Sequence, residues 1–248
     1  MRQKTMIIPN GSLGKIYGIL SLPEKEGRCP LIILSHGFGS DHEANQDYAE
    51  AFTEQGFGTF NFDFCGGGRN SMSGGTMEQM TVLTEAKDLM CLVQTFYAEP
   101  YVSAVYLWGE SQGGFVSAYV AAKQPDLVEK LVLLYPAFVL QSDAEKRRLA
   151  DGSFPEQTPF GDSFVTRKYN EDAVSFDIYE IIARYRKPVL ILHGDQDDVV
   201  PPEWSEKAAA VYERATLTMI PGGGHGFEST DRDQATKEAV AFFRKRRR

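Results

Sequence analysis

From residue 31 onward, short continuous apolar runs alternate with segments whose apolar residues recur at helical spacing. The runs that we predict as buried strands are Leu31–Leu34, Gly58–Phe64, Val105–Leu107, Leu131–Leu134, Val189–Leu192 and Leu217–Ile220. The segments that we predict as helices are Asp47–Gln55, Met77–Tyr97, Gln112–Lys123, Glu203–Glu213 and Asp233–Arg244. Buried strands without polar alternation, separated by amphipathic helices, are typical of a mostly parallel sheet with helices on both faces. The pattern therefore predicts an α/β fold.

Two further strand-like runs precede this alternation. Lys4–Ile8 and Lys15–Leu22 are separated by Pro9-Asn10-Gly11, which is a turn signal between β-type segments. We therefore expect an antiparallel pair at one edge of the sheet.

The regular spacing breaks between about residues 138 and 186, where two predicted strands lie much further apart than one crossover requires. Phe176–Tyr185 has helical spacing, and the rest of this segment is irregular. Long insertions in compact domains are commonly functional, and ligands of open α/β sheets bind at the carboxyl ends of the strands. We predict a single domain over residues 1–248, with this segment as a small cap over that end of the sheet.

Composition narrows the classes of function. The chain has 248 residues and a formal net charge of −8, which argues against a nucleic-acid partner because such proteins present a basic surface to phosphates. No run reaches membrane-spanning length and no export signal is visible, so we expect no membrane partner and a cytoplasmic location. Cys29, Cys65 and Cys91 fit neither a disulfide framework nor zinc spacing. The basic end Arg244–Arg248 suits the carboxyl end of a last helix.

A serine motif follows one of the predicted strands. Val105–Leu107 leads into Gly109-Glu110-Ser111-Gln112-Gly113, and a predicted helix comes next. On a sharp strand-to-helix turn the serine hydroxyl projects above the sheet, and close neighbours require small residues two before and two after it. Because Gly-x-Ser-x-Gly also arises by chance, the alternative is a glycine-rich turn with a solvated serine. The motif makes Ser111 the candidate nucleophile, and the partner residues decide between the two readings.

A serine nucleophile needs a base and an acid that orients the base. His225 lies in a glycine-rich loop after the last predicted strand and is the candidate base. The loop after Val189–Leu192 offers three aspartates: Asp195, Asp197 and Asp198. The segment resembles a turn of the α/β-hydrolases that commonly runs His-Gly-x-x-Asp-x-x-Val-Pro, and that register implies Asp197 as the acid. Asp198 is the alternative, and we otherwise expect Asp195 and Asp198 to serve the turn.

Acyl transfer also needs donors for the developing oxyanion. We expect the backbone N–H of Gln112, directly after the nucleophile, and that of Phe38, in the loop after Leu31–Leu34. A metal site at His36, Asp41 and His42 is the alternative for this loop, but no second ligand cluster supports it. We therefore predict no metal and no cofactor. His193 is expected to be structural.

The chain resembles the α/β-hydrolases along nearly its whole length and, more narrowly, the small bacterial cinnamoyl (feruloyl) esterases. The segments that carry the resemblance are His36–Phe38, Phe62–Gly68, Met80–Leu83, Gly109–Gly114, Pro136-Ala137, His193-Gly194 and His225–Phe227. Glu110 departs from the narrower group, which more often has a neutral residue or histidine there, and we expect it to be structural. Of all segments of the chain, the cap differs most from the sequences of this narrower group. The resemblance implies an α/β-hydrolase fold and a serine esterase that hydrolyses hydroxycinnamate or similar small esters.

The predicted substrate class assigns a role to aromatic residues of the cap. We expect Phe138, Phe160, Phe164 and Tyr169 to contact the substrate, the alternative being that they form a small core of the cap itself. A small-molecule ester is the expected partner, and a homodimer is kept as an expectation. Two other functions remain open: a serine peptidase or aminoacyl-peptide hydrolase, and a binding protein that kept the fold without the chemistry.

Overall fold

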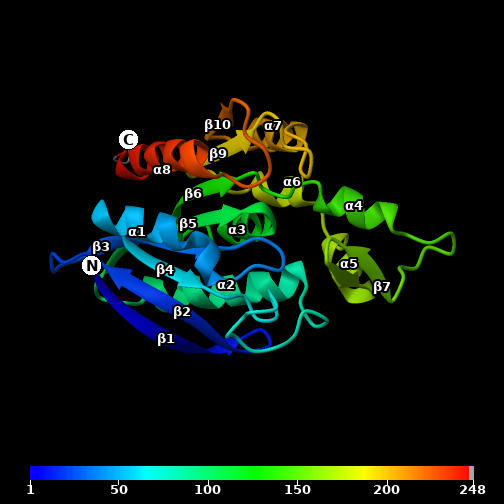
Figure 1. Cartoon of the computed structure of the whole chain (residues 1–248), viewed down its shortest axis with the longest axis horizontal. Helices are drawn as coiled ribbons and strands as arrows, with labels where there is room; N and C mark the ends of the chain where they lie inside the picture. The colour runs from blue at the N-terminus through cyan, green and yellow to red at the C-terminus, as the bar shows by residue number, and fades with distance from the viewer. Residues whose placement is uncertain (246–248) are drawn as a thin grey trace.

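The computed structural model describes residues 1–245, and its centre is an eight-stranded sheet within that range (Figure 1). In spatial order the strands are β1 (Arg2–Gly11), β2 (Gly14–Leu22), β4 (Gly58–Phe62), β3 (Cys29–Ser35), β5 (Val102–Glu110), β6 (Val128–Leu134), β9 (Val189–Gly194) and β10 (Ala215–Ile220). From β4 to β10 every neighbouring pair is parallel. The predicted α/β fold with a mostly parallel sheet is confirmed.

An antiparallel pair forms one edge of this sheet. β1 pairs with β2, and β2 pairs antiparallel with β4. The turn lies at Ser12-Leu13, so the expected turn at Pro9-Asn10-Gly11 is wrong. Pro9 can stay in the strand because an edge strand leaves one row of its backbone groups unpaired, and the register shifts between Ile8 and Gly11.

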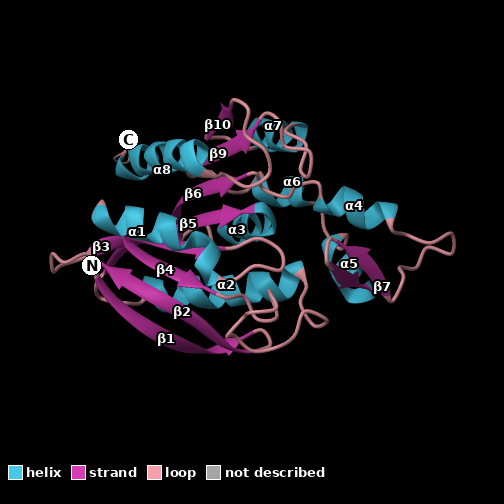
Figure 2. Cartoon of the chain, in the orientation of Figure 1, coloured by secondary structure: helices cyan, strands magenta, loops and turns pink. Residues whose placement is uncertain are grey.

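Helices cover both faces of the sheet (Figure 2). The helices α1 (Gln46–Glu54) and α8 (Ser229–Arg244) bury Phe52 and Phe243 in one core cluster. The other cluster lies on the opposite face and takes side chains from α2 (Val82–Tyr97), α3 (Ser111–Lys123) and α7 (Glu203–Val211). None of the described helices is long and apolar enough to cross a membrane. The basic residues 246–248 lie outside the described part of the chain.

The helix expected over Met77–Tyr97 begins later than predicted. Its N-cap is Thr81, whose side chain accepts from the backbone N–H groups of Leu83 and Thr84. In return, the Thr84 side-chain oxygen accepts from the backbone N–H of Thr81. This capping box fixes the first turn. The preceding residues 77–80 therefore remain outside the helix.

The segment between β6 and β9 forms a separate group of small elements beyond the carboxyl ends of the central strands (Figure 1). The group consists of α4 (Leu140–Lys146), β7 (Gln157–Phe160), β8 (Ser163–Thr166) and α5 (Arg167–Ala173), whereas α6 (Ile178–Ile182) packs against α3 and α7. The helix expected over Phe176–Tyr185 is shortened to α6. The β7–β8 hairpin escaped the pattern because each strand has only four residues. We call residues 138–186 the cap.

Candidate active site

The serine motif folds into a strained turn between β5 and α3. β5 ends at Glu110 and α3 begins at Ser111, whose φ of 50° lies in the left-handed region. A Cβ on Gly113 would lie 2.3 Å from the His36 carbonyl oxygen, and one on Gly109 would lie 2.4 Å from the Gly113 carbonyl oxygen. These contacts explain why glycine is required on both sides of the serine.

Three side chains from separate loops meet above the sheet at this turn. The Ser111 Oγ lies 3.0 Å from His225 Nε2, and His225 Nδ1 lies 2.8 Å from Asp197 Oδ2. Ser111 follows β5, Asp197 follows β9 and His225 follows β10. The structure thus brings together the three residues expected from the sequence as nucleophile, acid and base.

Of the three aspartates after β9, the structure brings Asp197 to the histidine. Its other oxygen, Oδ1, accepts from the backbone N–H groups of Val199 at 3.0 Å and Val200 at 2.8 Å. Burial disfavours its ionised form, but hydrogen bonds from His193 and His225 outweigh burial and hold the Asp197 pKa well below its usual range. The Asp198 side chain is exposed, and Asp195 accepts from the Gly222 backbone N–H at 2.7 Å.

His193 lies directly behind this carboxylate and is fully buried. Its Nε2 is 2.8 Å from the Val200 carbonyl oxygen and 3.2 Å from Asp197 Oδ2, and both of these atoms only accept. The proton therefore lies on Nε2, and Nδ1 accepts from the Ser205 hydroxyl at 2.7 Å. His193 orients Asp197, and its structural role follows from these contacts.

Two backbone N–H groups belong to segments that lie next to Ser111. Phe38 lies in the loop after β3 and its N–H has no acceptor among the described residues, while that of Gln112 lies in the first turn of α3, where helical acceptors are lacking. Gly37 brings the loop close, since a Cβ there would lie 3.4 Å from the Ser111 Cβ. His36 fixes it by accepting from the Phe64 N–H at 3.1 Å and donating to the Gly37 carbonyl at 2.8 Å.

A cavity of about 350 Å³ opens in front of Ser111. Its aromatic wall consists of Phe38, Phe160 and Tyr169, and the centroids of the Phe38 and Phe160 rings are 4.8 Å apart. Asp143 and Arg147, on and directly after α4, add charge to the same cavity. This pair could not be predicted from the sequence without α4, which its weak pattern did not predict. Their spacing of four residues, one helical turn, was the only signal.

The four cap aromatics expected to contact a substrate divide into two groups. Phe160 and Tyr169 line the cavity. Phe138 and Phe164 do not, which corrects the expectation for them. Phe138 is fully buried, with its ring centroid 6.2 Å from that of Phe115 and 5.8 Å from that of Tyr179. It belongs to the main core cluster, which also contains Phe115 of α3, and not to a separate small core of the cap.

The Gln112 side chain links the cap to α2. The Tyr169 hydroxyl donates to Gln112 Oε1 at 2.5 Å, and Gln112 Nε2 donates to Glu85 Oε2 at 2.9 Å. Burial raises the pKa of Glu85 to about 8, an effect that the Gln112 hydrogen bond partly offsets and the nearby Asp88 enhances. A buried carboxyl on α2 is thus tied through Gln112 to the wall of the cavity.

The loop that offered an alternative metal site has another arrangement. His42 Nδ1 lies 2.7 Å from Asp63 Oδ1, and the backbone N–H of His42 donates to the same oxygen. Across residues 1–245, no group of three or more histidine, cysteine, aspartate or glutamate side chains is placed to hold a metal ion. The contacts of His42 and Asp63 join the loop after β3 to the end of β4.

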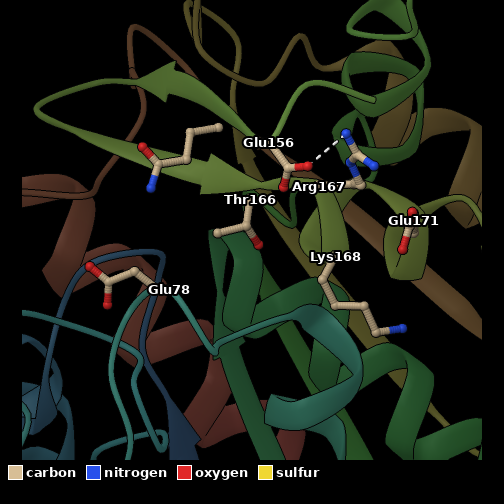
Figure 3. A pocket seen from close by; sticks show the side chains of 7 residues that line it. Glu78, Glu156, Thr166, Arg167, Lys168 and Glu171 are labelled. Atoms are coloured by element: carbon tan, nitrogen blue, oxygen red, sulfur yellow. Dashed lines mark ion pairs between the residues drawn. The ribbon is translucent and has the colours of Figure 1, made fainter. Parts of the chain in front are cut away.

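A separate, open groove of about 450 Å³ runs along the β7–β8 hairpin. Figure 3 shows the charged side chains around it and the ion pair of Glu156 with Arg167, which measures 2.8 Å. The lining residues are Glu78, Glu156, Gln157, Thr166, Arg167, Lys168 and Glu171. None of them belongs to the serine site, so the groove is distinct from the cavity at Ser111.

The fold and this site define an α/β-hydrolase of the esterase type. Residues 28–158 match the family described as serine aminopeptidase, S33, and the chain belongs to that family. Residues 175–246 match a second family, described as TAP-like protein.

Individual proteins agree with this classification. A structure of Est1E from Butyrivibrio proteoclasticus with bound ferulic acid is similar with a TM-score of 0.83 and 29% identity, over 92% of this chain and 94% of that one. The bifunctional esterase/perhydrolase DCH of Acinetobacter calcoaceticus is 24% identical, over 87% of this chain and 92% of that protein. A putative esterase/lipase of Haemophilus influenzae is 23% identical, over 87% and 84%. The chain is therefore a hydrolase of the esterase-like group within this fold.

Proposed function

We propose that the protein is a serine carboxylic-ester hydrolase that acts through an acyl-enzyme. The observation that carries the proposal is the continuous hydrogen-bonded chain from Ser111 through His225 to Asp197. Each group in it is chemically competent for its part. The N–H groups of Phe38 and Gln112 supply the remaining requirement, a site for the oxyanion.

The reaction follows from this arrangement. The Ser111 Oγ attacks the ester carbonyl while His225 Nε2 takes the hydroxyl proton, and Asp197 stabilises the imidazolium that results. The tetrahedral oxyanion accepts from the Phe38 and Gln112 N–H groups. His225 then protonates the leaving alcohol, and a water molecule, activated by the same histidine, hydrolyses the acyl-enzyme.

For the substrate we propose an ester of a hydroxycinnamic or similar flat aromatic acid. Three aromatic side chains, Phe38, Phe160 and Tyr169, form one wall of the cavity. Aromatic rings favour edge-to-face and offset contacts with other rings, so this wall suits a planar acyl group. The solved structure of Est1E with ferulic acid, 29% identical to this chain, supports the same class.

Ser111→Ala tests the proposal. We expect hydrolysis of a small nitrophenyl ester to fall by about 10³-fold or more, and labelling by a fluorophosphonate probe to disappear. Ser103→Ala, a change at an exposed serine, should retain both. Labelling or hydrolysis that persists in Ser111→Ala would overturn the assignment. In the wild type, a higher specificity constant on short aliphatic esters than on methyl ferulate would overturn the aromatic substrate alone.

Amide hydrolysis is the second candidate, favoured by the family description of residues 28–158 as serine aminopeptidase. The same triad serves esters and amides. Aminoacyl nitroanilides compared with the corresponding aminoacyl esters separate the two activities. A wild-type protein that binds these compounds without being labelled at Ser111 would instead be a non-catalytic binding protein.

A further inference from the structure

Glu110 is an acidic residue directly before Ser111, and it lines the cavity. Two donors reach its carboxylate. The Tyr135 hydroxyl donates to Oε2 at 2.9 Å, and the backbone N–H of Gly37 also donates to the carboxylate. Gly37 lies in the loop after β3 and Tyr135 in the loop after β6, while β5 lies between these two strands. One carboxylate therefore joins the two loops on either side of Ser111.

Both of these loops carry residues that lie next to groups of the proposed catalytic site. Gly37 precedes Phe38, whose N–H is a proposed oxyanion donor. The Tyr135 ring meets the His225 ring edge-on, with centroids 4.9 Å apart. Tyr135 has a φ of 35° and its N–H donates to the Leu192 carbonyl at 2.8 Å. A bulky residue keeps such a backbone conformation only where its surroundings fix it, so the placement of this ring is specific.

We propose that Glu110 is a positioning residue, which holds the Gly37–Phe38 loop and the Tyr135 ring in place so that the oxyanion donor and His225 keep their geometry relative to Ser111. The inference rests on the proposed esterase function. A carboxylate suits this task because both of its oxygens accept without bringing a competing donor. Its hydrogen bonds are also charge-assisted and hence stronger than neutral ones. A glutamine offers one accepting oxygen instead of two and lacks the charge that strengthens these bonds.

The charge of Glu110 adds a second effect. Burial raises the Glu110 pKa, whereas the bonds from Tyr135 and Gly37 and the nearby His225 and Arg232 oppose that rise. Tyr48 on α1 also faces this carboxylate. When ionised, Glu110 favours the imidazolium form of His225, as an opposite charge does for any titrating group. Removal of the charge should therefore move the ascending limb of the pH–activity profile to lower pH.

The test compares Glu110→Gln, Tyr135→Phe and their combination, with Glu78→Gln in the charged groove as the matched control. kcat, KM and the pH profile are measured per active site titrated with a fluorophosphonate, together with thermal unfolding. We expect Glu110→Gln to lower kcat about 10- to 100-fold, with KM changed less than about threefold. Its ascending pH limb should move to lower pH by about 0.5 unit. Tyr135→Phe should lower kcat without moving that limb, and the combined variant should be no slower than Glu110→Gln within about twofold.

Each contrary result has a distinct meaning. Wild-type kcat and an unmoved pH limb in folded Glu110→Gln overturn the inference, even where thermal stability falls, because that pattern shows a structural role alone. Should Glu110→Gln not fold, an unchanged kcat in folded Tyr135→Phe overturns it. A wild-type protein that is neither labelled at Ser111 nor active on esters overturns the proposed function and this inference with it.

Discussion

The Tyr169 hydroxyl donates a 2.5 Å hydrogen bond to the side-chain oxygen of Gln112. This bond connects α5 in the cap with the residue whose backbone N–H is a proposed oxyanion donor. Both side chains are buried, so the bond forms where water does not compete with it. The wall of the cavity and the turn at Ser111 are thereby physically coupled.

Loss of this hydroxyl should affect both stability and turnover. Tyr169→Phe leaves the Gln112 oxygen buried without its donor, so we expect the free energy of unfolding to fall by about 1–3 kcal/mol. The specificity constant on aromatic esters should fall about tenfold, because small displacements at a reacting centre are costly. Chemical denaturation and steady-state kinetics measure the two effects. Tyr97→Phe, at an exposed tyrosine, is the control, and equal results for both variants would contradict the coupling.

Asp197 and Asp198 are neighbours in sequence but differ in their expected importance. Asp197→Asn removes the charge that stabilises the His225 imidazolium and disturbs the tautomer, so kcat should fall by about 10⁴-fold. Asp198→Asn changes an exposed side chain and should retain activity within about twofold. Kinetics on a nitrophenyl ester decide the matter. A large loss in Asp198→Asn with an active Asp197→Asn would reverse the assignment of the acid.

Glu85 should make stability depend on pH. Its pKa rises from 4.5 to about 8 on folding, chiefly through burial. Its contribution to the free energy of unfolding is therefore fully present below pH 4.5 and is lost as pH rises through 8. At about 1.4 kcal/mol per pKa unit, the loss amounts to roughly 5 kcal/mol. Glu85→Gln keeps an acceptor for Gln112 without the titrating group.

We therefore expect Glu85→Gln to unfold at nearly the wild-type temperature at pH 4.5 and at a higher temperature at pH 8. Thermal unfolding followed by circular dichroism across this range measures the difference. A difference between the two proteins that is the same at every pH would show that Glu85 does not titrate as its burial implies.

Phe160 offers a test of the aromatic wall. Phe160→Ala removes the ring that meets Phe38 edge-on, so KM for methyl ferulate should rise about tenfold. KM for a short aliphatic ester, which needs no ring contact, should change by less than about threefold. Phe164→Ala, outside the cavity lining, is the matched control. Equal increases in KM on both esters would contradict the proposed acyl site.

Some parts of the molecule could be predicted because their signal lies in adjacent residues. The central strands are continuous apolar runs, and the turn at Ser111 is marked by Gly109 and Gly113 in a strand–turn–helix setting. The order of Ser111, Asp197 and His225 along the chain then follows the order of the strands that carry them. Short elements gave weaker signals, and both the β7–β8 hairpin and α4 were missed for that reason.

The sequence by itself determined the α/β fold and the three residues that meet at the turn, because local periodicity and turn chemistry encode them. The tertiary structure decided which side chains face the cavity. Phe138 and Phe160 look alike in the sequence, yet one packs in the core and the other lines the cavity. It also gave Glu110 its partners, because Gly37 and Tyr135 are distant in sequence and meet its carboxylate only when β3, β5 and β6 lie side by side.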